Sequence, residues 1–268
     1  MKKIVYLLSA LVTLLFTSQA QNDTMYIMKA GQVTAKYHVT NQLDSIIFYK
    51  PTNSNSVTDA SGNTYPTVKI GTQTWMAENL RSTKYSDGTD IPIVTDNTQW
   101  ATNFNNNTTL PMMSWYNNDE ATYINNKYGA LYNWYALSPT ANGNKNLCPS
   151  GWHIPTDAEW NTLIGYLDPE FNATVTIGSQ SKLAGGKMKS TTGWNKNVTN
   201  ESGFSGLPGG TRRYDGSFVQ IGDNGYWWSS TEFYPKTAWL RCLSDSFDDT
   251  IIFDYDKFGG ISVRCIRD

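Results

Sequence analysis

The chain has 268 residues and a formal net charge of −2, with 16% charged and 13% aromatic residues. A weakly charged, slightly acidic chain is not expected to bind nucleic acid, which needs a concentrated positive surface. Few charges together with many aromatic, Asn and Thr residues are typical of an extracellular protein rich in β-structure.

Residues 1–20 have the pattern of a secretory signal peptide: two lysines, an apolar run over residues 4–16, and small residues before Gln21. The run is shorter than the roughly 20 residues that span a bilayer. No cysteine follows the cleavage site to carry a lipid. We therefore expect export to the cell envelope or the medium, with no transmembrane segment after the signal is removed. The mature chain keeps 19 of the 21 basic residues against 23 acidic ones, a formal charge of −4.

After the signal, short alternating segments at 24–29, 33–39 and 43–49 predict strands of a small β-hairpin appendage over residues 21–50. Residues 51–58 have no apolar periodicity and are expected to be a linker. The main domain is then predicted to cover residues 59–268.

In the main domain, residues 64–70 and 73–77 predict a second hairpin. Residues 87–123 are rich in Asn, Asp, Thr and Pro and are expected to form a long irregular loop region, of a kind that often carries binding. Short strands separated by turns are expected at 225–229, 237–243, 250–254 and 260–266.

A strong helix signal begins at Thr156, which can cap the free amides while Glu159 bonds back to the cap residue. Trp160, Leu163, Ile164 and Leu167 share one helical face and are interpreted as core, and Asp168-Pro169 ends the helix. A second, short helix is expected over residues 181–189, weakened by paired glycines. Two helices between groups of strands predict an α+β domain.

The chain has three cysteines, and export favours a disulfide. Spacing alone does not choose the pair among Cys148, Cys242 and Cys265. A bridge between Cys148 and Cys265 would close a loop of more than 100 residues, worth roughly 4–5 kcal/mol in chain-entropy models. Cys242 lies in an apolar strand-like run and is then expected to be a buried structural thiol.

Several blocks of this domain resemble the bacterial family called the Fibrobacter succinogenes major paralogous domain, over about residues 59–268. The blocks are Trp75–Leu80, Tyr128–Trp134, Cys148–Trp160, Gly203–Gly210, Tyr226–Thr231 and Ser262–Cys265. The resemblance implies pairing of Cys148 with Cys265 and a fold distantly similar to C-type lectins and formylglycine-generating enzymes, with short antiparallel strands, two helices and long irregular loops. It implies no particular activity. The appendage is similar to one found on exported proteins of Bacteroidetes-type bacteria.

The sequence offers little for catalysis. His38 lies in the appendage and His153 lies between Trp152 and Ile154, where a structural hydrogen bond is expected. Too few His and Cys residues exist to build a zinc site. Cys242 and Cys265 are too far apart in the sequence to resemble the close cysteine pair of the oxidases. We therefore expect no catalytic residues, no metal site and no cofactor.

Two segments call for comparison with known sites. Residues 206–212 contain several glycines but no following lysine or helix, so a turn packed closely on backbone is expected and not a phosphate loop. Asp245, Asp248, Asp249, Asp254 and Asp256 could together hold calcium. They match no known calcium-loop pattern, and a solvated acidic hairpin is preferred.

Trp115, Tyr116, Asp119 and Glu120 form one patch that could resemble a glycosidase site. The tryptophans are expected to divide into core anchors, such as Trp152, Trp160 and Trp228, and exposed rings that stack on a ligand. The leading hypothesis is a non-enzymatic, exported module that presents loops to a glycan or a surface protein. The alternatives are a glycan hydrolase, a degenerate relative of the oxidases, and a structural subunit of a surface assembly.

Overall fold

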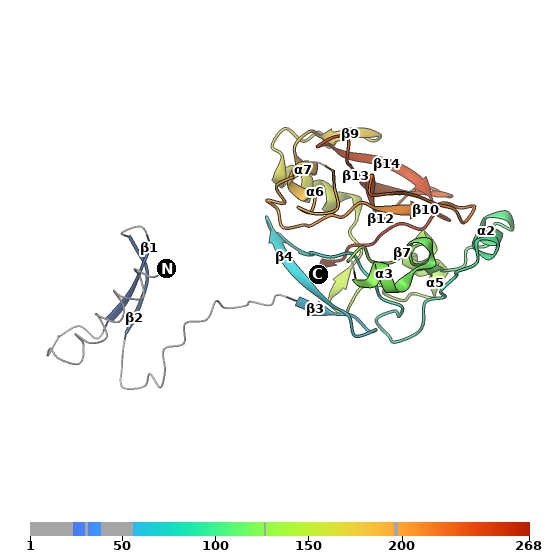
Figure 1. The fold of residues 1–268 in the computed structure, drawn as a ribbon, viewed down its shortest axis with the longest axis horizontal. Coiled ribbons are helices and arrows are strands. Elements are labelled where there is room, and N and C mark those ends of the chain that lie inside the picture. Colours follow the sequence, from blue (N-terminus) through green and yellow to red (C-terminus); the bar gives the residue numbers. More distant parts are fainter. Residues whose placement is uncertain (1–23, 30–31, 39–55, 126, 196–197) are drawn as a thin grey trace. The chain divides into compact units, whose positions relative to one another are not determined.

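The computed structural model describes residues 24–29, 32–38, 56–125, 127–195 and 198–268 (Figure 1). Chain contacts divide it into two units, residues 1–52 and 53–268, which are treated separately. The predicted signal peptide and the strand predicted at 43–49 lie outside the described residues. In the first unit, β1 (Thr24–Lys29) and β2 (Gln32–His38) form the antiparallel pair that their alternation predicts, with a bulge after Ile27.

The first sheet of the second unit has five strands in the order β3-β4-β5-β15-β8. Its members are β3 (Ser56–Thr58), β4 (Thr64–Ile70), β5 (Gln73–Met76), β15 (Ile266–Arg267) and β8 (Trp152–His153). Ser56–Thr58 are the last residues of the segment expected to be a linker, but they form β3 because they pair with β4. The C-terminal strand β15 lies between β5 and β8, with Ile266 opposite both Trp75 and His153.

The second sheet has four strands in the order β12-β13-β14-β9. Its members are β12 (Asn224–Tyr234), β13 (Thr237–Ser244), β14 (Thr250–Asp256) and β9 (Gly178–Ser181). Six consecutive residues of β13, 238–243, are buried, so both faces of this strand are covered. Its nearly continuous apolar sequence follows from that double burial. Two further antiparallel pairs are β6 (Met113–Ser114) with β7 (Leu131–Tyr132), and β10 (Gly209–Arg212) with β11 (Phe218–Ile221).

The helix predicted after Thr156 is present as α6 (Asp157–Leu167). Both bonds of its capping box form: the Thr156 hydroxyl accepts from the Glu159 amide, and the Glu159 carboxylate accepts from the Thr156 amide. The four residues predicted as its apolar face are all buried. They pack with Trp75, Phe204 and Trp227 into one core cluster.

The prediction of only two helices is wrong, because the described residues contain six α-helices and one 3-10 helix. Besides α6 these are α2 (Asn97–Asn105), η1 (Tyr116–Asn118), α3 (Glu120–Asn125), α4 (Trp134–Leu137), α5 (Pro139–Asn142) and α7 (Ala184–Met188). Residues 87–123 are therefore less irregular than expected. Asp96 caps α2 by accepting from the Gln99 amide at 2.7 Å, so a polar segment becomes helical through local capping.

Two other segments also differ from the prediction. The helix expected from residue 181 begins at Ala184, because Ser181 ends strand β9, where it pairs with Thr250. The strand expected over residues 260–266 is reduced to β15. Its first part forms single bridges to three different partners, with Gly260 opposite Arg212, Ile261 opposite Tyr132 and Ser262 opposite Trp227. A segment that changes partner at each residue keeps no common register with any one strand.

The core of the second unit has two main apolar clusters. The first contains Cys148, Cys265, Trp152 and Trp228, and the second surrounds α6 and contains Trp160. All three tryptophans predicted as core anchors are therefore buried. The unit is an α+β fold, with its C-terminus held inside the five-stranded sheet (Figure 1). Among the described residues, no helix combines the length and apolar character needed to cross a membrane.

Candidate functional site

Cys148 and Cys265 form a disulfide, as the family resemblance implied. Both residues are fully buried in the first core cluster, and their Cα atoms are 5.9 Å apart. The bond joins the segment that leads into α6 to the last strand of the chain. Cys242, the third cysteine, is free and buried, and burial raises the pKa of its thiol to about 12. It is buried as expected, and a thiol with so high a pKa carries little thiolate at neutral pH.

His153 forms the structural hydrogen bonds expected of it. Its Nε2 lies 2.8 Å from Glu159 Oε1, and its Nδ1 lies 2.5 Å from Asp268 Oδ1. Burial alone would lower the pKa of His153, but the hydrogen bonds to the two carboxylates raise it above its ordinary value of 6.5. Burial would raise the pKa of Glu159, but hydrogen bonds from Thr156 and His153 lower it below 4.5. The imidazolium therefore joins the start of α6 to the C-terminal residue.

This arrangement predicts a pH-dependent contribution to stability. The contribution of His153 to the free energy of unfolding is complete below pH 6.5 and is lost as the pH rises through its raised pKa. The contribution of Glu159 is lost as the pH falls through its lowered pKa. We expect His153→Ala to lower the free energy of unfolding most between about pH 4.5 and 6.5, by on the order of 1 kcal/mol, because solvent screens half-exposed pairs. Urea unfolding of both proteins from pH 5 to 9 measures this. An unchanged difference across that range would contradict it.

The patch considered for glycan hydrolysis divides into buried rings and exposed carboxylates. Trp115 and Tyr116 are buried, at 2% and 5% exposure. Asp119 is exposed, and its carboxylate accepts from the Thr122 amide, which together with the Thr122 hydroxyl lowers the pKa of Asp119. Glu120 begins α3 and is also exposed. The two rings are therefore covered, while the two carboxylates face solvent.

The acidic segment 245–256 divides between two places. The Asp245 carboxylate accepts from the Asn195 amide at 2.8 Å, and Asp248 lies 3.5 Å from the Lys189 ammonium. Those two aspartates precede the start of β14, whereas Asp254 and Asp256 lie at its C-terminal end. In the part of the chain that the structure describes, no group of three His, Cys, Asp or Glu side chains is arranged to hold a metal ion.

The glycine-containing segment 206–212 packs closely on backbone, as predicted. Gly210 has φ of +63°, and a Cβ atom there would lie 2.5 Å from the Val219 carbonyl oxygen. Only glycine fits this position in β10 without displacing β11. The segment thus fixes the β10–β11 hairpin.

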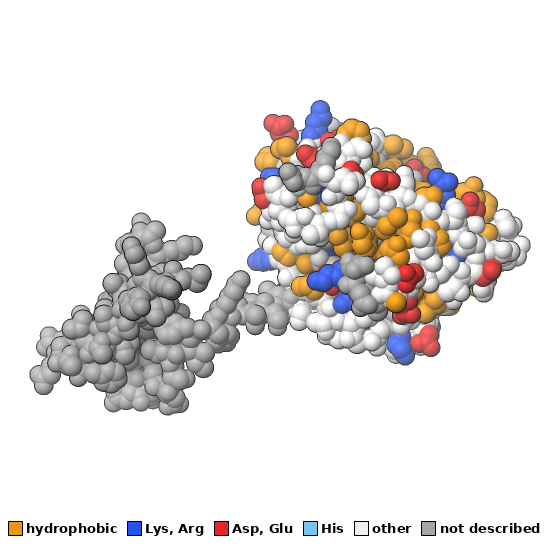
Figure 2. All heavy atoms as spheres, in the orientation of Figure 1, with side chains coloured by type: hydrophobic (Ala, Val, Ile, Leu, Met, Phe, Trp, Pro, Cys, Tyr) orange, Lys and Arg blue, Asp and Glu red, His pale blue; other side chains and the backbone are white. Residues whose placement is uncertain are grey.

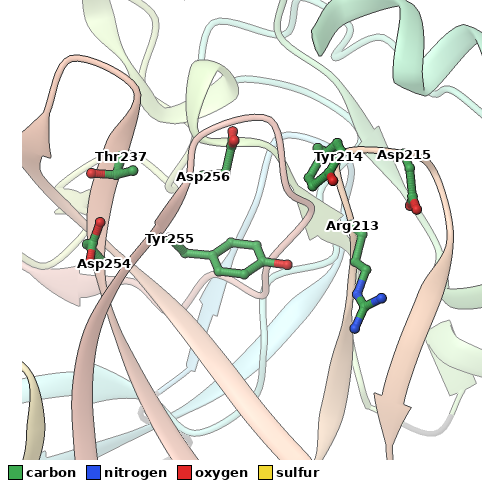
Figure 3. Close-up of a pocket in the computed structure, with 7 residues that line it drawn as sticks. All are labelled: Arg213, Tyr214, Asp215, Thr237, Asp254, Tyr255 and Asp256. Atoms are coloured by element: carbon green, nitrogen blue, oxygen red, sulfur yellow. The ribbon is translucent and has the colours of Figure 1, made fainter. Parts of the chain in front are cut away.

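At the tip of that hairpin lies a hollow of about 340 Å³, which the sequence did not reveal. Three segments form it: the turn after β10, the start of β13, and the end of β14 (Figure 3). The lining residues are Arg213, Tyr214, Asp215, Thr237, Asp254, Tyr255 and Asp256. The backbone bridge between Arg212 and Gly260 brings the turn and the end of β14 together, since Gly260 follows β14 closely.

Two tyrosine rings form the apolar part of the hollow. Tyr255 extends across it toward Arg213 (Figure 3), and its position depends on Gly259, where a Cβ atom would lie 2.4 Å from the ring. Tyr214 is 44% exposed and rests on Phe104, with ring centroids 4.4 Å apart. Burial raises the pKa of Tyr255, so its hydroxyl is a donor at neutral pH.

The polar groups of the hollow are of two kinds. Asp215 and Asp256 stabilise their own turns: Asp215 accepts from the Ser217 amide and hydroxyl, and Asp256 from the Phe258 amide. In contrast, neither the Arg213 guanidinium nor the Asp254 carboxylate hydrogen bonds or ion-pairs with any described residue. The Thr237 hydroxyl is covered and also has no hydrogen-bond partner among these residues. The hollow thus offers a planar cation and a carboxylate to a ligand, while the Thr237 hydroxyl is covered.

The carboxyl groups of Asp215 and Asp256 also differ in the direction of their pKa shifts. Hydrogen bonds from the Ser217 side chain and amide lower the pKa of Asp215, whereas burial raises the pKa of Asp256. Sequence reading placed Asp254 and Asp256 in a solvated acidic hairpin and gave no role to residues 213–215. The one available signal was the Tyr-Asp-Gly turn, which combines a ring with a carboxylate at a hairpin tip.

Residues 68–267 match the family model of the Fibrobacter succinogenes major domain. No curated protein and no solved structure matches the chain. The family match covers most of the chain and contains every motif block quoted above for the resemblance. The chain therefore belongs to the Fibrobacter succinogenes major domain family.

Proposed function

We propose that this protein is an exported, non-catalytic binding module of C-type-lectin-like architecture, and that the hollow at the tip of the β10–β11 hairpin holds a glycan. Export is supported by the signal-like sequence of residues 1–20 and by the buried disulfide, which is typical of oxidising compartments. The cell envelope or the medium is then its place of action.

The observation that carries the proposal is the pairing of rings with unsatisfied polar groups in one hollow. Sugars present apolar C–H faces that pack on aromatic rings and hydroxyl pairs that bind planar polar groups. Tyr214 and Tyr255 supply the rings, while Arg213 and Asp254 supply a donor and an acceptor that have no hydrogen-bond or ion-pair partner among the described residues. Arg213 acts on Asp215 and Tyr255 only through its charge. A guanidinium presents its donors in a fixed fork, which suits two adjacent hydroxyls.

The test uses the purified mature chain on a glycan array, with and without calcium, followed by calorimetry on the glycans bound. Arg213 and Tyr214 are exposed, so their replacement by Ala should leave the fold intact. We expect Arg213→Ala and Tyr214→Ala each to weaken binding at least tenfold, about 1.4 kcal/mol. Tyr166→Ala is the matched control, since Tyr166 is 64% exposed on α6 and does not line this hollow.

Glycan binding that is unchanged in both hollow variants would refute the assignment of the site. The contrasting environments of Asp215 and Asp256 resemble an acid and base pair. The bound glycans should therefore also be assayed for release of reducing ends. If the protein releases reducing ends and Asp256→Asn abolishes this release, the protein is a glycan hydrolase and not a binding module.

A further inference from the structure

A row of four aromatic rings lies on the second unit, outside the residues that line the hollow. The ring of Phe218 (β11) lies 5.2 Å from that of Tyr116 (η1), centroid to centroid. The rings of Tyr116 and Tyr123 (α3) are 5.4 Å apart, and those of Tyr123 and Tyr128 are 5.7 Å apart. Tyr116 is the buried floor of the row, while the other three are half-buried and reach the surface.

The apolar surface continues beyond Tyr128. A Cβ atom on the exposed Gly193 would lie 3.4 Å from the Tyr128 hydroxyl and 3.2 Å from the side chains of Leu207 and Pro208. Figure 2 shows hydrophobic side chains gathered on the face that carries α3 and β7 in Figure 1. The aromatic row, Phe218 to Tyr128, thus extends to the half-buried Leu207, with Pro208 buried beneath it.

The charges beside the aromatic row are unequal. Asp119, Glu120 and Asp223 are all exposed. Asp119 and Asp223 are close enough to the rings to help raise the pKa of Tyr123 and of Tyr116 respectively, after burial, which is the larger cause. Glu120 precedes Tyr123 by three residues on α3, so both lie on one helical face.

The buried Arg212 guanidinium lies 4.7 Å from the Phe218 ring centroid and donates to the Val94 carbonyl oxygen, and a carboxylate pairs the cation beside Tyr128. Glu78 binds the Arg81 guanidinium at 2.9 Å and the Lys127 ammonium at 2.8 Å, and Lys127 directly precedes Tyr128. The surface around the rings therefore carries exposed carboxylates, while the Lys127 ammonium beside Tyr128 is paired with Glu78.

We infer that the aromatic row with its acidic border is a docking surface for an extended peptide segment in which lysine or arginine alternates with aromatic or aliphatic residues. The carboxylates complement the cations of such a segment, and cations also bind the faces of the tyrosine rings. Its apolar side chains pack on the exposed parts of the half-buried rings.

The ring geometry favours a peptide over a glycan on this surface. The successive rings are tilted by 54°, 49° and 73°, so they offer no shared plane for a sugar chain. The hollow and the aromatic row would then give one module two ligands of different chemistry.

The experiment titrates the mature chain with three fluorescein-labelled hexapeptides, alternating Lys-Trp, Glu-Trp and Lys-Ser, and follows fluorescence anisotropy. We expect the Lys-Trp peptide to bind at least tenfold more tightly than either of the others. Tyr123→Ala removes a central ring, and Glu120→Lys reverses one exposed charge without touching the core. Both should weaken binding of the Lys-Trp peptide at least tenfold, whereas Arg213→Ala and Tyr166→Ala should not.

Equal binding of the Lys-Trp and Lys-Ser peptides would show charge attraction alone and would overturn the inference. So would binding that Tyr123→Ala and Glu120→Lys leave unchanged, or no binding of the Lys-Trp peptide at all. A glycan whose binding is lost in Tyr123→Ala would assign the row to sugars instead. The Arg213→Ala variant keeps this outcome separate from failure of the proposed glycan site.

Discussion

Replacing Cys148 and Cys265 together by Ala is expected to lower the free energy of unfolding by about 4–5 kcal/mol. The bond spans 117 residues of sequence, and closing so long a loop removes much of the conformational freedom of the unfolded chain. Because domains are stable by only about 5–15 kcal/mol in total, this is a large fraction. Urea unfolding of the oxidised mature chain and of the double variant measures the loss.

The third cysteine provides the control. Cys242 is buried but unbonded, so Cys242→Ala removes a sulfur atom from the core without opening a loop. We expect it to cost about 1–2 kcal/mol, as for other small truncations in a core. If the Cys148→Ala/Cys265→Ala variant is no less stable than Cys242→Ala, the disulfide adds nothing to stability beyond the packing of its sulfur atoms. Peptide mapping that finds the thiols of Cys148 and Cys265 free in exported material would show that the disulfide does not form.

The parts of the fold that sequence predicted well are those with local signals. Thr156 and Glu159 mark the start of α6 by themselves, and the strands β4, β13 and β14 are visible as β-branched and aromatic runs between turns. The failures have a common cause. Residues 260–262 look like part of a strand, but their partners are single residues in three distant segments, and no local pattern encodes that.

The candidate site was hidden for the same reason. Arg213 and Asp254 are 41 positions apart, and they share a hollow only because β10 bridges to Gly260. A turn with one arginine and a strand end with two aspartates each look like ordinary solvated surface. The disulfide was predicted only in part. Three cysteines and the expected export indicated a bond, but the choice of Cys148 and Cys265 came from the family resemblance.

Arg264 was another residue that sequence could not place. A single arginine among apolar residues looks the same whether its strand is exposed or buried, yet this guanidinium is completely buried. Its Nη2 donates to Asn79 Oδ1 at 2.6 Å, and it also donates to the carbonyl oxygens of Met76 and Phe204. The charge lies 4.1 Å from the centroid of the Phe204 ring.

No carboxylate accepts a hydrogen bond from this guanidinium within the described residues. Oxygen atoms and rings contact its charge, and the Glu78 carboxylate stabilises it from a distance. Burial lowers the pKa of Arg264 to about 9, which still leaves it charged at neutral pH. Asn79 is the central acceptor, because its Oδ1 also accepts from the Trp227 indole at 2.8 Å. Its Nδ2 donates to the Tyr128 carbonyl oxygen, which joins this network to the segment that carries the aromatic row.

We therefore expect Asn79→Ala to lower the free energy of unfolding by about 3–5 kcal/mol, because it leaves a buried charge without its main acceptor. Arg264→Met should cost less, since it removes the charge and leaves only neutral carbonyl groups unpaired, at about 1–3 kcal/mol each. Arg267→Met is the matched control, because Arg267 is exposed and its one side-chain hydrogen bond, to Thr74, is 3.3 Å long. Urea unfolding at neutral pH measures all three.

The double variant Asn79→Ala/Arg264→Met decides whether the two residues act as one unit. If the loss in Asn79→Ala comes from the stranded charge, removing that charge should recover part of it, and the double variant should be more stable than the sum of the single losses predicts. Additive losses would mean that Asn79 matters for its bonds to Trp227 and Tyr128 alone. An Arg264→Met variant as stable as Arg267→Met would show that the buried cation contributes nothing to holding β5 and the C-terminal segment together.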